Sequence, residues 1–156
     1  MSIKMTVLKQ VFAGAIVSGL LVAGTTQVAA QAAPDTTLAA AAKEPDAKVT
    51  ASGLVIRMLK EGAGAQPSAT STVKVHYKGA FPDGKEFDSS YKRGEPIEFP
   101  LSGVIKCWTE GVALMKVGGK AKLTCPSSIA YGARGAGGVI PPNATLVFEV
   151  DLLGVR

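Results

Sequence analysis

The sequence is poor in the residue types that most catalytic and metal-binding sites require. Its 156 residues include one histidine, His76, and two cysteines, Cys107 and Cys125. Together these are too few for a zinc site with four protein ligands. His76 alternates with Lys74 and Lys78, which places it on the polar face of a strand, so we expect a surface or locally hydrogen-bonded group rather than a general base. These shortages argue against a metalloenzyme and against a hydrolase.

Clustered positive charge is also missing. The formal net charge is +5, and the lysines are scattered without a run of five or more. A nucleic-acid surface needs a clustered basic face, so we expect no nucleic-acid partner. The glycine-rich stretch 132–138 looks superficially like a nucleotide loop, but it leads into Val139 and Ile140 and then two prolines, not into a helix as phosphate binding requires. We therefore expect no nucleotide and no other cofactor.

The first thirty residues have the pattern of a secretory signal. Lys4 and Lys9 form a basic start, residues 11–23 are apolar and uncharged, and residues 28–30 (VAA) are small. The apolar run is shorter than the roughly 20 residues of a transmembrane helix, although an uncleaved anchor is the alternative. No cysteine lies near the cleavage site for a lipoprotein anchor. We expect cleavage near Ala30, a periplasmic location and no stable membrane insertion.

Residues 31–50 separate this signal from the part of the chain that is expected to fold. They are rich in alanine, threonine, aspartate and proline, with Leu38 and Val49 as the large apolar residues. Such a segment buries too little apolar surface to offset the entropy lost on ordering. A short helix over 36–44 is an alternative, but it would be marginal in isolation. The prediction is a flexible tether over 31–50 and one domain over 51–156.

From residue 54 onward the hydrophobic pattern predicts antiparallel strands. Val73, Val75 and Tyr77 alternate with polar residues, which is typical of a half-buried strand. The same alternation, or a shorter strand-like run, recurs at 54–59, 87–88, 97–99, 121–125 and 146–152. The domain is therefore predicted to contain five or so strands.

One stretch has the spacing of a helix. Trp108, Val112 and Met115 recur at i, i+4 and i+7, with Lys116 in the predicted last turn and a glycine pair as the stop. Because the apolar face of a sheet must be covered, this helix is expected to cover it. The predicted fold class is α+β, with a twisted antiparallel sheet around one short helix.

The two cysteines are predicted to face the same interior. Cys125 points inward by strand alternation, and Cys107 begins the helix that covers the sheet. An exported protein meets an oxidising compartment, where disulfides persist. We predict a Cys107–Cys125 disulfide that closes a loop of about 18 residues. Two buried thiols that pack as small hydrophobic groups are the alternative.

The segments around the aromatic residues indicate whether these residues form only a core or also a binding site. Periodicity alone favours assigning them simply to a core. The order of segments indicates more: VHYKG at 75–79, DGKEFDSS at 83–90, VIKCWTEG at 104–111, MKVGGK at 115–120, AYG at 130–132 and GVIPPNATLVF at 138–148. In this order and spacing, over about residues 50–156, the chain resembles the FKBP-type peptidyl-prolyl isomerases, in particular exported bacterial members with a single isomerase domain.

The resemblance implies a half-barrel sheet around the helix, with a ligand pocket between them. It implies an isomerase that rotates X-Pro bonds of exported proteins during folding, without a covalent step or a cofactor. Proline-containing polypeptides are the expected substrates, and macrolide ligands of immunophilins are further expected partners. A module that binds or chaperones such chains without turnover is the rival hypothesis. Only the short stretch 31–50 precedes the domain, so we expect a monomer.

The resemblance also carries site residues onto matching positions. The expected catalytic residues are Asp88, Trp108, Tyr131 and Phe148, with Trp108 as the pocket floor. The expected substrate-binding residues are Tyr77, Phe87, Arg93, Ile97, Val104, Ile105, Val139 and Ile140. Within this set the Ile105 N–H and the Tyr131 hydroxyl bind carbonyl groups, and Arg93 pairs with Asp88. Ile97 replaces a common pocket aromatic, Cys107 replaces a usual glycine, and Ala136 replaces a histidine of some members.

Overall fold

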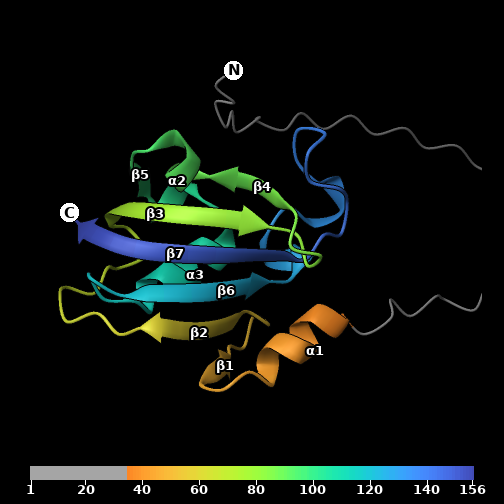
Figure 1. Cartoon of the computed structure of the whole chain (residues 1–156), viewed down its shortest axis with the longest axis horizontal. Helices are drawn as coiled ribbons and strands as arrows, with labels where there is room; N and C mark the ends of the chain where they lie inside the picture. The colour runs from red at the N-terminus through yellow and green to blue at the C-terminus, as the bar shows by residue number, and fades with distance from the viewer. Residues whose placement is uncertain (1–34) are drawn as a thin grey trace, which may run out of the picture. The chain divides into compact units, whose positions relative to one another are not determined.

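The computed structural model describes residues 35–156 (Figure 1). The predicted signal peptide and residues 31–34 of the predicted tether lie outside this range. The strands are β1 (Ala47–Val49), β2 (Val55–Lys60), β3 (Thr72–Ala80), β4 (Glu86–Ser89), β5 (Ile97–Pro100), β6 (Lys120–Cys125) and β7 (Leu146–Val155). The helices are α1 (Thr36–Ala42), α2 (Ser90–Arg93) and α3 (Lys106–Ala113), with 3-10 turns η1 (Leu101–Gly103), η2 (Ser127–Ile129) and η3 (Gly132–Arg134).

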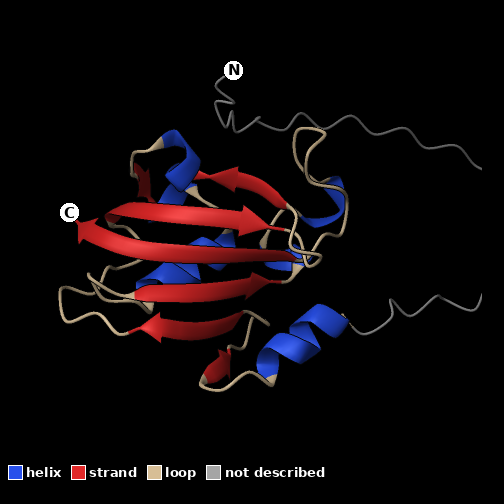
Figure 2. Cartoon of the chain, in the orientation of Figure 1, coloured by secondary structure: helices blue, strands red, loops and turns tan. Residues whose placement is uncertain are grey.

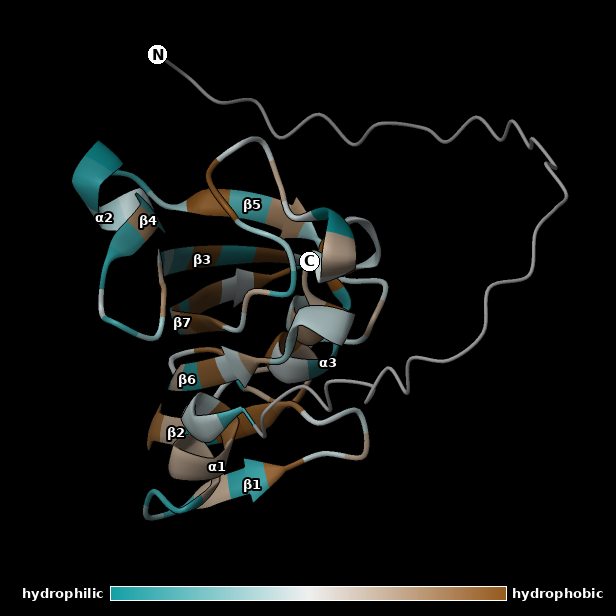
Figure 3. Ribbon diagram, turned by 90° about the vertical axis from the view of Figure 1, so that its right-hand side faces the viewer, coloured by the Kyte–Doolittle hydropathy of each residue, from teal (hydrophilic) through white to brown (hydrophobic). Residues whose placement is uncertain are grey.

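The strands form one antiparallel sheet, which Figure 2 shows in red. Its order is β1-β2-β6-β7-β3-β4, and β5 pairs with β3 as well. Val73, Val75 and Tyr77 of β3 are buried on one face, as their alternation predicted. Helix α3 covers this face (Figure 3). Helix α1 borders the outer face, where its residues line a hollow together with Lys78 of β3, Lys122 of β6 and Glu149 of β7. The predicted α+β class, an antiparallel sheet around a short helix, is confirmed.

The core lies between α3 and the inner face of the sheet. Trp108 and Val112 of α3 are buried together with Leu123 of β6 and with Phe148 and Val150 of β7. Burying each large apolar side chain contributes about 1.5–3 kcal/mol. The packing of α3 against β6 and β7 therefore holds the helix that carries Trp108.

Helix α3 is shorter than the hydrophobic spacing predicted. It ends at Ala113, where the N–H of Leu114 donates to the carbonyl of Gly111 over 3.2 Å and closes the last turn. Met115 is fully buried although it lies beyond the helix, and its N–H donates to Val112 O over 3.0 Å. A turn after the helix brings Met115 back to the core. The spacing of seven residues from Trp108 to Met115 therefore extends beyond the end of the helix. Lys116 is consequently not in the last helical turn.

Residues 35–50, the described part of the segment that was predicted to be a flexible tether, form α1 and β1 in the structure. Asp35 caps α1 by accepting from Thr37 N over 3.0 Å, and Thr145 donates a hydrogen bond to Asp35. Glu44 accepts from Lys122 of β6 over 2.6 Å. Strand β1 pairs with β2, with Ala47 opposite Arg57. The composition argument counted apolar burial only, whereas a cap, ion pairs and strand pairing hold this segment to the sheet.

The edge of β3 is shared by β4 and β5. The pairing of β4 ends at Lys78↔Ser89, and that of β5 starts at Val75↔Ile97. Helix α2 and the residues after it fill the interval between these two strands. Side chains of this segment therefore lie beside the middle of β3, where Tyr77 sits. The sequence pattern did not predict this helix.

A disulfide joins α3 to β6. Cys107, the second residue of α3, bonds Cys125, the last residue of β6, with the Cα atoms 5.8 Å apart. Both residues are fully buried. The bond joins the helix that carries Trp108 to the strand that leads into residues 126–142.

Candidate functional site

Five rings meet between α3 and the sheet, and we call them the aromatic cluster: Tyr77, Phe87, Phe99, Trp108 and Phe148. The indole of Trp108 is central, since it meets three neighbours edge to face. Its ring centroid lies 5.2 Å from that of Tyr77, 5.6 Å from Phe99 and 5.5 Å from Phe148. Edge-to-face contacts are the favoured geometry for aromatic pairs. Strands β3, β4, β5 and β7 and helix α3 each contribute one ring.

Phe87 reaches this cluster because Gly79 of β3, which pairs with the neighbouring Asp88, leaves room for the Phe87 ring. The ring of Phe87 stands edge to face with Phe148 at 5.7 Å. A Cβ added to Gly79 would lie 2.6 Å from the Phe87 ring and 2.9 Å from the Phe148 ring. A larger residue at position 79 would therefore force both rings to move.

The cluster has a buried floor and a more accessible rim. Trp108 and Phe148 are each 4% exposed. Phe87, Val104 and Tyr131 are half-buried and pack against the core from its edge. The floor is therefore dry, while the rim is in contact with solvent.

Three polar side chains meet at the rim. The Tyr77 hydroxyl donates a short hydrogen bond to Asp88 Oδ2. Arg93 Nη1 donates to Asp88 Oδ1 over 2.7 Å, and Arg93 Nη2 donates to the Tyr77 hydroxyl over 3.1 Å. The guanidinium also lies over the Tyr77 ring, with Cζ 5.7 Å from its centroid. The predicted Asp88–Arg93 pair is present, and Tyr77 completes a closed polar triangle.

Burial and charge keep the rim phenols protonated. Burial and the hydrogen bond to Asp88 raise the pKa of Tyr77 to about 12, against the opposing effect of Arg93. Burial, together with the negative charge of Asp88, also raises the pKa of Tyr131. The hydrogen bonds to Tyr77 and Asp88 raise the pKa of Arg93. At neutral pH the rim thus presents hydroxyl donors beside an Arg–Asp pair.

The N-terminal end of α3 presents a backbone donor at this rim. Ile105 is the N-cap residue and is half-buried, and its carbonyl accepts from Trp108 and Thr109. Within residues 35–156 no backbone carbonyl accepts from the Ile105 N–H. Donors at a helix N-terminus of this kind are available to an incoming carbonyl oxygen.

The remaining predicted residues lie in different surroundings. Ile97 is half-buried on β5, beside Val75 in the register. Ile140 is buried in the core, whereas its neighbour Val139 is 45% exposed. Sequence reasoning left out Phe99, which contacts both Trp108 and Tyr77. Its position two residues after Ile97 on one strand was the available signal, because alternation puts both on the same face.

His76 lies outside this arrangement. Its Nδ1 is 2.9 Å from the Ser90 hydroxyl, and its ring stacks on Tyr91 with centroids 4.7 Å apart. This is the locally hydrogen-bonded histidine that the alternation predicted. Within the described residues, no group of three or more histidine, cysteine, aspartate or glutamate side chains is placed to hold a metal ion.

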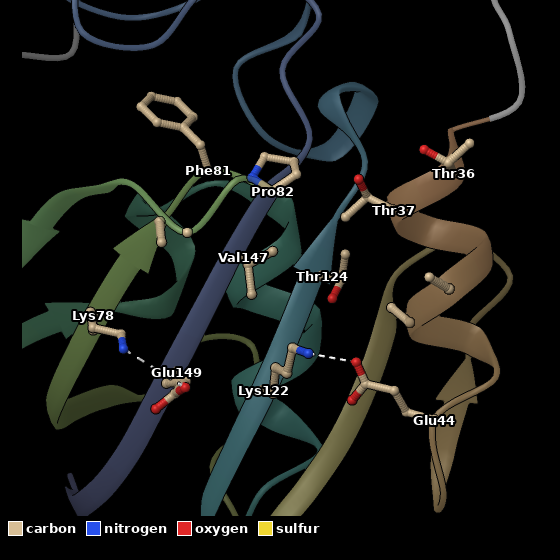
Figure 4. Close-up of a pocket in the computed structure, with 14 residues that line it drawn as sticks. Thr36, Thr37, Glu44, Lys78, Phe81, Pro82, Lys122, Thr124, Val147 and Glu149 are labelled. Atoms are coloured by element: carbon tan, nitrogen blue, oxygen red, sulfur yellow. Dashed lines mark hydrogen bonds and ion pairs between the residues drawn. The ribbon is translucent and has the colours of Figure 1, made fainter.

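Two hollows open on the described surface. The outer hollow, about 610 Å³, lies between α1 and strands β3, β6 and β7 (Figure 4). Its charged side chains are paired, Lys122 with Glu44 at 2.6 Å and Lys78 with Glu149 at 4.0 Å. The loop hollow, about 660 Å³, lies between the β3–β4 turn and residues 134–142. Phe81 lines both hollows and packs against Phe87 of the aromatic cluster at 5.1 Å, and the loop hollow also contains Ile140, which belongs to the core.

Known proteins are similar to this chain in sequence and in fold. The sequence profile of the family described as FKBP-type peptidyl-prolyl cis-trans isomerase matches residues 64–153. An FKBP-type peptidyl-prolyl cis-trans isomerase of Aeromonas hydrophila, FkpA, is 56% identical over 119 residues, which cover 76% of this chain and 44% of the relative. The FK506-binding protein 1 of Dictyostelium discoideum is 57% identical over 103 residues, 65% of this chain and 96% of that protein.

A solved structure agrees with these sequences. The crystal structure of FkpA from Escherichia coli is similar with a TM-score of 0.75 and 50% sequence identity, covering 78% of this chain and 56% of that chain. The chain spans about half the length of the FkpA proteins that it matches.

Proposed function

The chain belongs to the family of FKBP-type peptidyl-prolyl cis-trans isomerases, and from this premise we propose that it accelerates the rotation of X-Pro bonds in polypeptides. The observation that carries the proposal is the buried indole of Trp108, ringed by three aromatic side chains beside an accessible polar rim. Such a site accommodates a prolyl ring over an apolar floor, with hydrogen-bonding groups for the flanking carbonyls.

The reaction itself requires no bond-breaking group. The X-Pro bond prefers trans by only about 0.5–1 kcal/mol, yet rotation takes tens to hundreds of seconds unaided. The barrier of about 18–20 kcal/mol arises from amide resonance. A site that binds the twisted amide more tightly than the planar amide lowers this barrier. Acid–base and nucleophilic chemistry are therefore unnecessary.

The proposed mechanism assigns a role to each part of the site. Trp108 and Phe148 hold the prolyl ring in a dry environment, which disfavours the more dipolar planar amide. The Ile105 N–H and the Tyr131 hydroxyl bind carbonyls on either side and fix the chain. Asp88 faces the rotating carbonyl. The burial of Trp108 and Phe148, the two hydrogen-bond donors and the polar triangle support these roles.

The remaining site residues support these groups. Arg93 orients Asp88 through the 2.7 Å hydrogen bond. Tyr77 and Phe87 form the sides of the ring-binding site, and Ile97, Val104, Val139 and Ile140 border it. Tyr77 also holds the second oxygen of Asp88. The triangle thereby fixes the carboxylate before a substrate arrives.

We further propose that the protein is exported and acts on exported chains, with the signal peptide cleaved near Ala30. The N-terminal pattern supports this location, as does the Cys107–Cys125 disulfide, because disulfides persist in oxidising compartments. Within residues 35–156, none of the helices is long and apolar enough to cross a membrane. A monomeric state and macrolide binding stay predictions, to be tested by light scattering and by inhibition of turnover.

An exchange measurement on a short Xaa-Pro peptide tests the activity. We expect purified protein to raise the cis–trans exchange rate, measured by NMR line exchange, in proportion to its concentration. Boiled protein serves as the control. Binding of the peptide without faster exchange would reject the enzyme and leave a module that binds proline-containing chains.

A further inference from the structure

The loop hollow has one wall made by the tight turn between β3 and β4. The Phe81 N–H donates to Lys85 O, and the Gly84 N–H donates to Phe81 O, both over 2.9 Å. The Asp83 carboxylate accepts from the Lys85 N–H over 2.8 Å. The wall is thus held by its own hydrogen bonds before any ligand binds.

The opposite wall is a short hairpin. Ala136 and Ile140 exchange two backbone hydrogen bonds of 3.0 Å each. Gly135 precedes this hairpin with φ at +66°, and an added Cβ would lie 2.2 Å from the Ile140 carbonyl oxygen. Only glycine fits there. Two preformed walls lower the ordering cost of binding a chain between them.

The hollow continues from the aromatic cluster. Phe81 packs against Phe87 at 5.1 Å, and Phe87 packs against Phe148 at 5.7 Å. An extended chain rises about 3.3 Å per residue, so each ring-to-ring step corresponds to between one and two residues. A polypeptide whose proline packs against Phe148 lies two such steps from Phe81, and it therefore reaches the loop hollow about two to four residues away from that proline.

The charge of the hollow favours one kind of side chain. Lys85 and Arg134 line it and are exposed. Neither forms an ion pair with any residue of the described part of the chain. Asp83 is the one acidic residue in the lining, and a backbone N–H already occupies one of its oxygens. Two cations without an ion-pair partner in the described residues and one carboxylate lie above a floor of Phe81 and Ile140, so the lining keeps a net positive charge.

We propose that the loop hollow binds the polypeptide segment beside the isomerised proline and that Lys85 and Arg134 select an acidic side chain in that segment. This inference rests on the proposed isomerase function and adds a substrate preference to it. Prolines that lie about two to four residues from a glutamate or aspartate would be the preferred targets.

Matched peptides test the preference. Each has a Leu-Pro core and either glutamate or the isosteric glutamine three residues before or three residues after the proline. We expect kcat/KM, measured by NMR exchange, to be about two- to fivefold higher for the glutamate peptide at one of these positions, the size expected for exposed ion pairs. Raising the salt concentration should shrink this ratio, because exposed charges are screened.

A double variant assigns the preference to the hollow. In K85Q/R134Q the ratio of glutamate to glutamine turnover should fall to about one, as expected when the exposed pairs are removed. Lys116 lies before β6, at the end opposite to residues 126–142, and is exposed. The K116Q variant, which also removes a surface lysine, should keep the wild-type ratio.

The outcomes separate this inference from the function on which it rests. Equal turnover of all glutamate and glutamine peptides would overturn the preference while the isomerase activity stands. A ratio that persists in K85Q/R134Q would overturn the role of the hollow. No turnover of any peptide would reject the activity and the preference together.

Discussion

Arg93 meets Tyr77 at the point along β3 where neither β4 nor β5 pairs with that strand. The Tyr77 hydroxyl lies 3.1 Å from Arg93 Nη2. At the same point the backbone N–H of Tyr77 donates to the Ser90 hydroxyl over 2.8 Å, so a side chain of α2 replaces the missing strand neighbour. The interruption of the β3 edge therefore has a function in the site. It lets α2 deliver a guanidinium to the rim of the aromatic cluster without leaving the backbone of Tyr77 unpaired.

Replacing Arg93 should weaken catalysis by freeing Asp88. The pair is nearly half exposed on both sides, so we expect R93Q to lower kcat/KM about fivefold, or about 1 kcal/mol, the upper range for exposed ion pairs. As a positioning residue, Arg93 should affect kcat more than KM, and R93K should recover part of the loss. K92Q, on the same short helix and paired with Glu86, is the matched control. Unchanged kinetics in R93Q would contradict the role.

Replacing Trp108 should lower kcat/KM far more than replacing His76. Truncation of a buried tryptophan to alanine costs about 3–5 kcal/mol, so W108L, which retains apolar volume, is the better variant. We expect kcat/KM of W108L to fall at least about tenfold, since loss of about 1.4 kcal/mol of transition-state binding suffices. H76Q changes a residue outside the aromatic cluster and should turn over like the wild type. Circular dichroism would verify that both variants are folded.

Equal losses in W108L and H76Q would place the site elsewhere in the domain. Thermal unfolding of both variants separates a lost site from a lost fold. A folded W108L protein with wild-type kinetics would contradict the assignment of Trp108 as the floor.

The disulfide should stabilise the domain measurably. It closes a loop with a sequence separation of 18, which the chain-entropy account values at about 3 kcal/mol. The free energy of unfolding of C107A/C125A, measured in urea, should therefore be lower by that amount. The m-value should rise, because the unfolded chain without the cross-link is less compact. Alanine is preferred to serine because both sites are fully buried, and a buried hydroxyl without a partner is costly.

Alkylation in denaturant without reductant gives an independent readout. Wild-type protein should take up no label, and after reduction it should take up two labels. Full labelling of both thiols without reductant would rule out the bond in the purified protein.

Glu44 should make the docking of α1 depend on pH. The hydrogen bond from Lys122 lowers the pKa of Glu44 below 4.5, with help from Arg57 and against the effect of burial. A lowered pKa in the folded state contributes stability that is present above the unfolded value and is lost as the pH falls through the folded value. We expect E44Q to be less stable by about 1 kcal/mol at pH 7, as for a pair of surface ion pairs.

The same variant should lose less stability than the wild type as the pH falls below 4.5, which urea unfolding at pH 6 and pH 3 would measure. Glu61 is exposed and in no ion pair with any residue from 35 to 156, so E61Q is the control. Identical pH dependence of E44Q and the wild type would show that α1 is not held by this carboxylate.

Much of the fold could be predicted because strand alternation is local. The alternation within residues 73–77 places Val73, Val75 and Tyr77 on one face of their strand. The same alternation predicts that Cys125 points into the core. The site residues were predicted from a family resemblance, which rests on the order of the sequence motifs. Phe99 was omitted because the motif did not contain it, although its spacing from Ile97 placed it on the same face.

The N-terminal segment and the polar rim needed the structure. Glu44 finds its partner Lys122 at a sequence separation of 78, and no local pattern around either residue indicates that contact. Composition therefore predicted a tether where a capped helix docks. The meeting of Arg93 with Tyr77 depends on where β4 stops and β5 starts, which is a matter of register between strands.

The sequence by itself determined which side chains face the core, that the two cysteines share that interior, and which family the motifs resemble. Tertiary structure decided how the rings stand around Trp108, how the Tyr77–Asp88–Arg93 triangle closes and where α1 docks. The physical reason is that a repeating hydrophobic period is encoded by neighbours in the chain, whereas ring orientation, ion pairing and strand register depend on groups that only folding brings together.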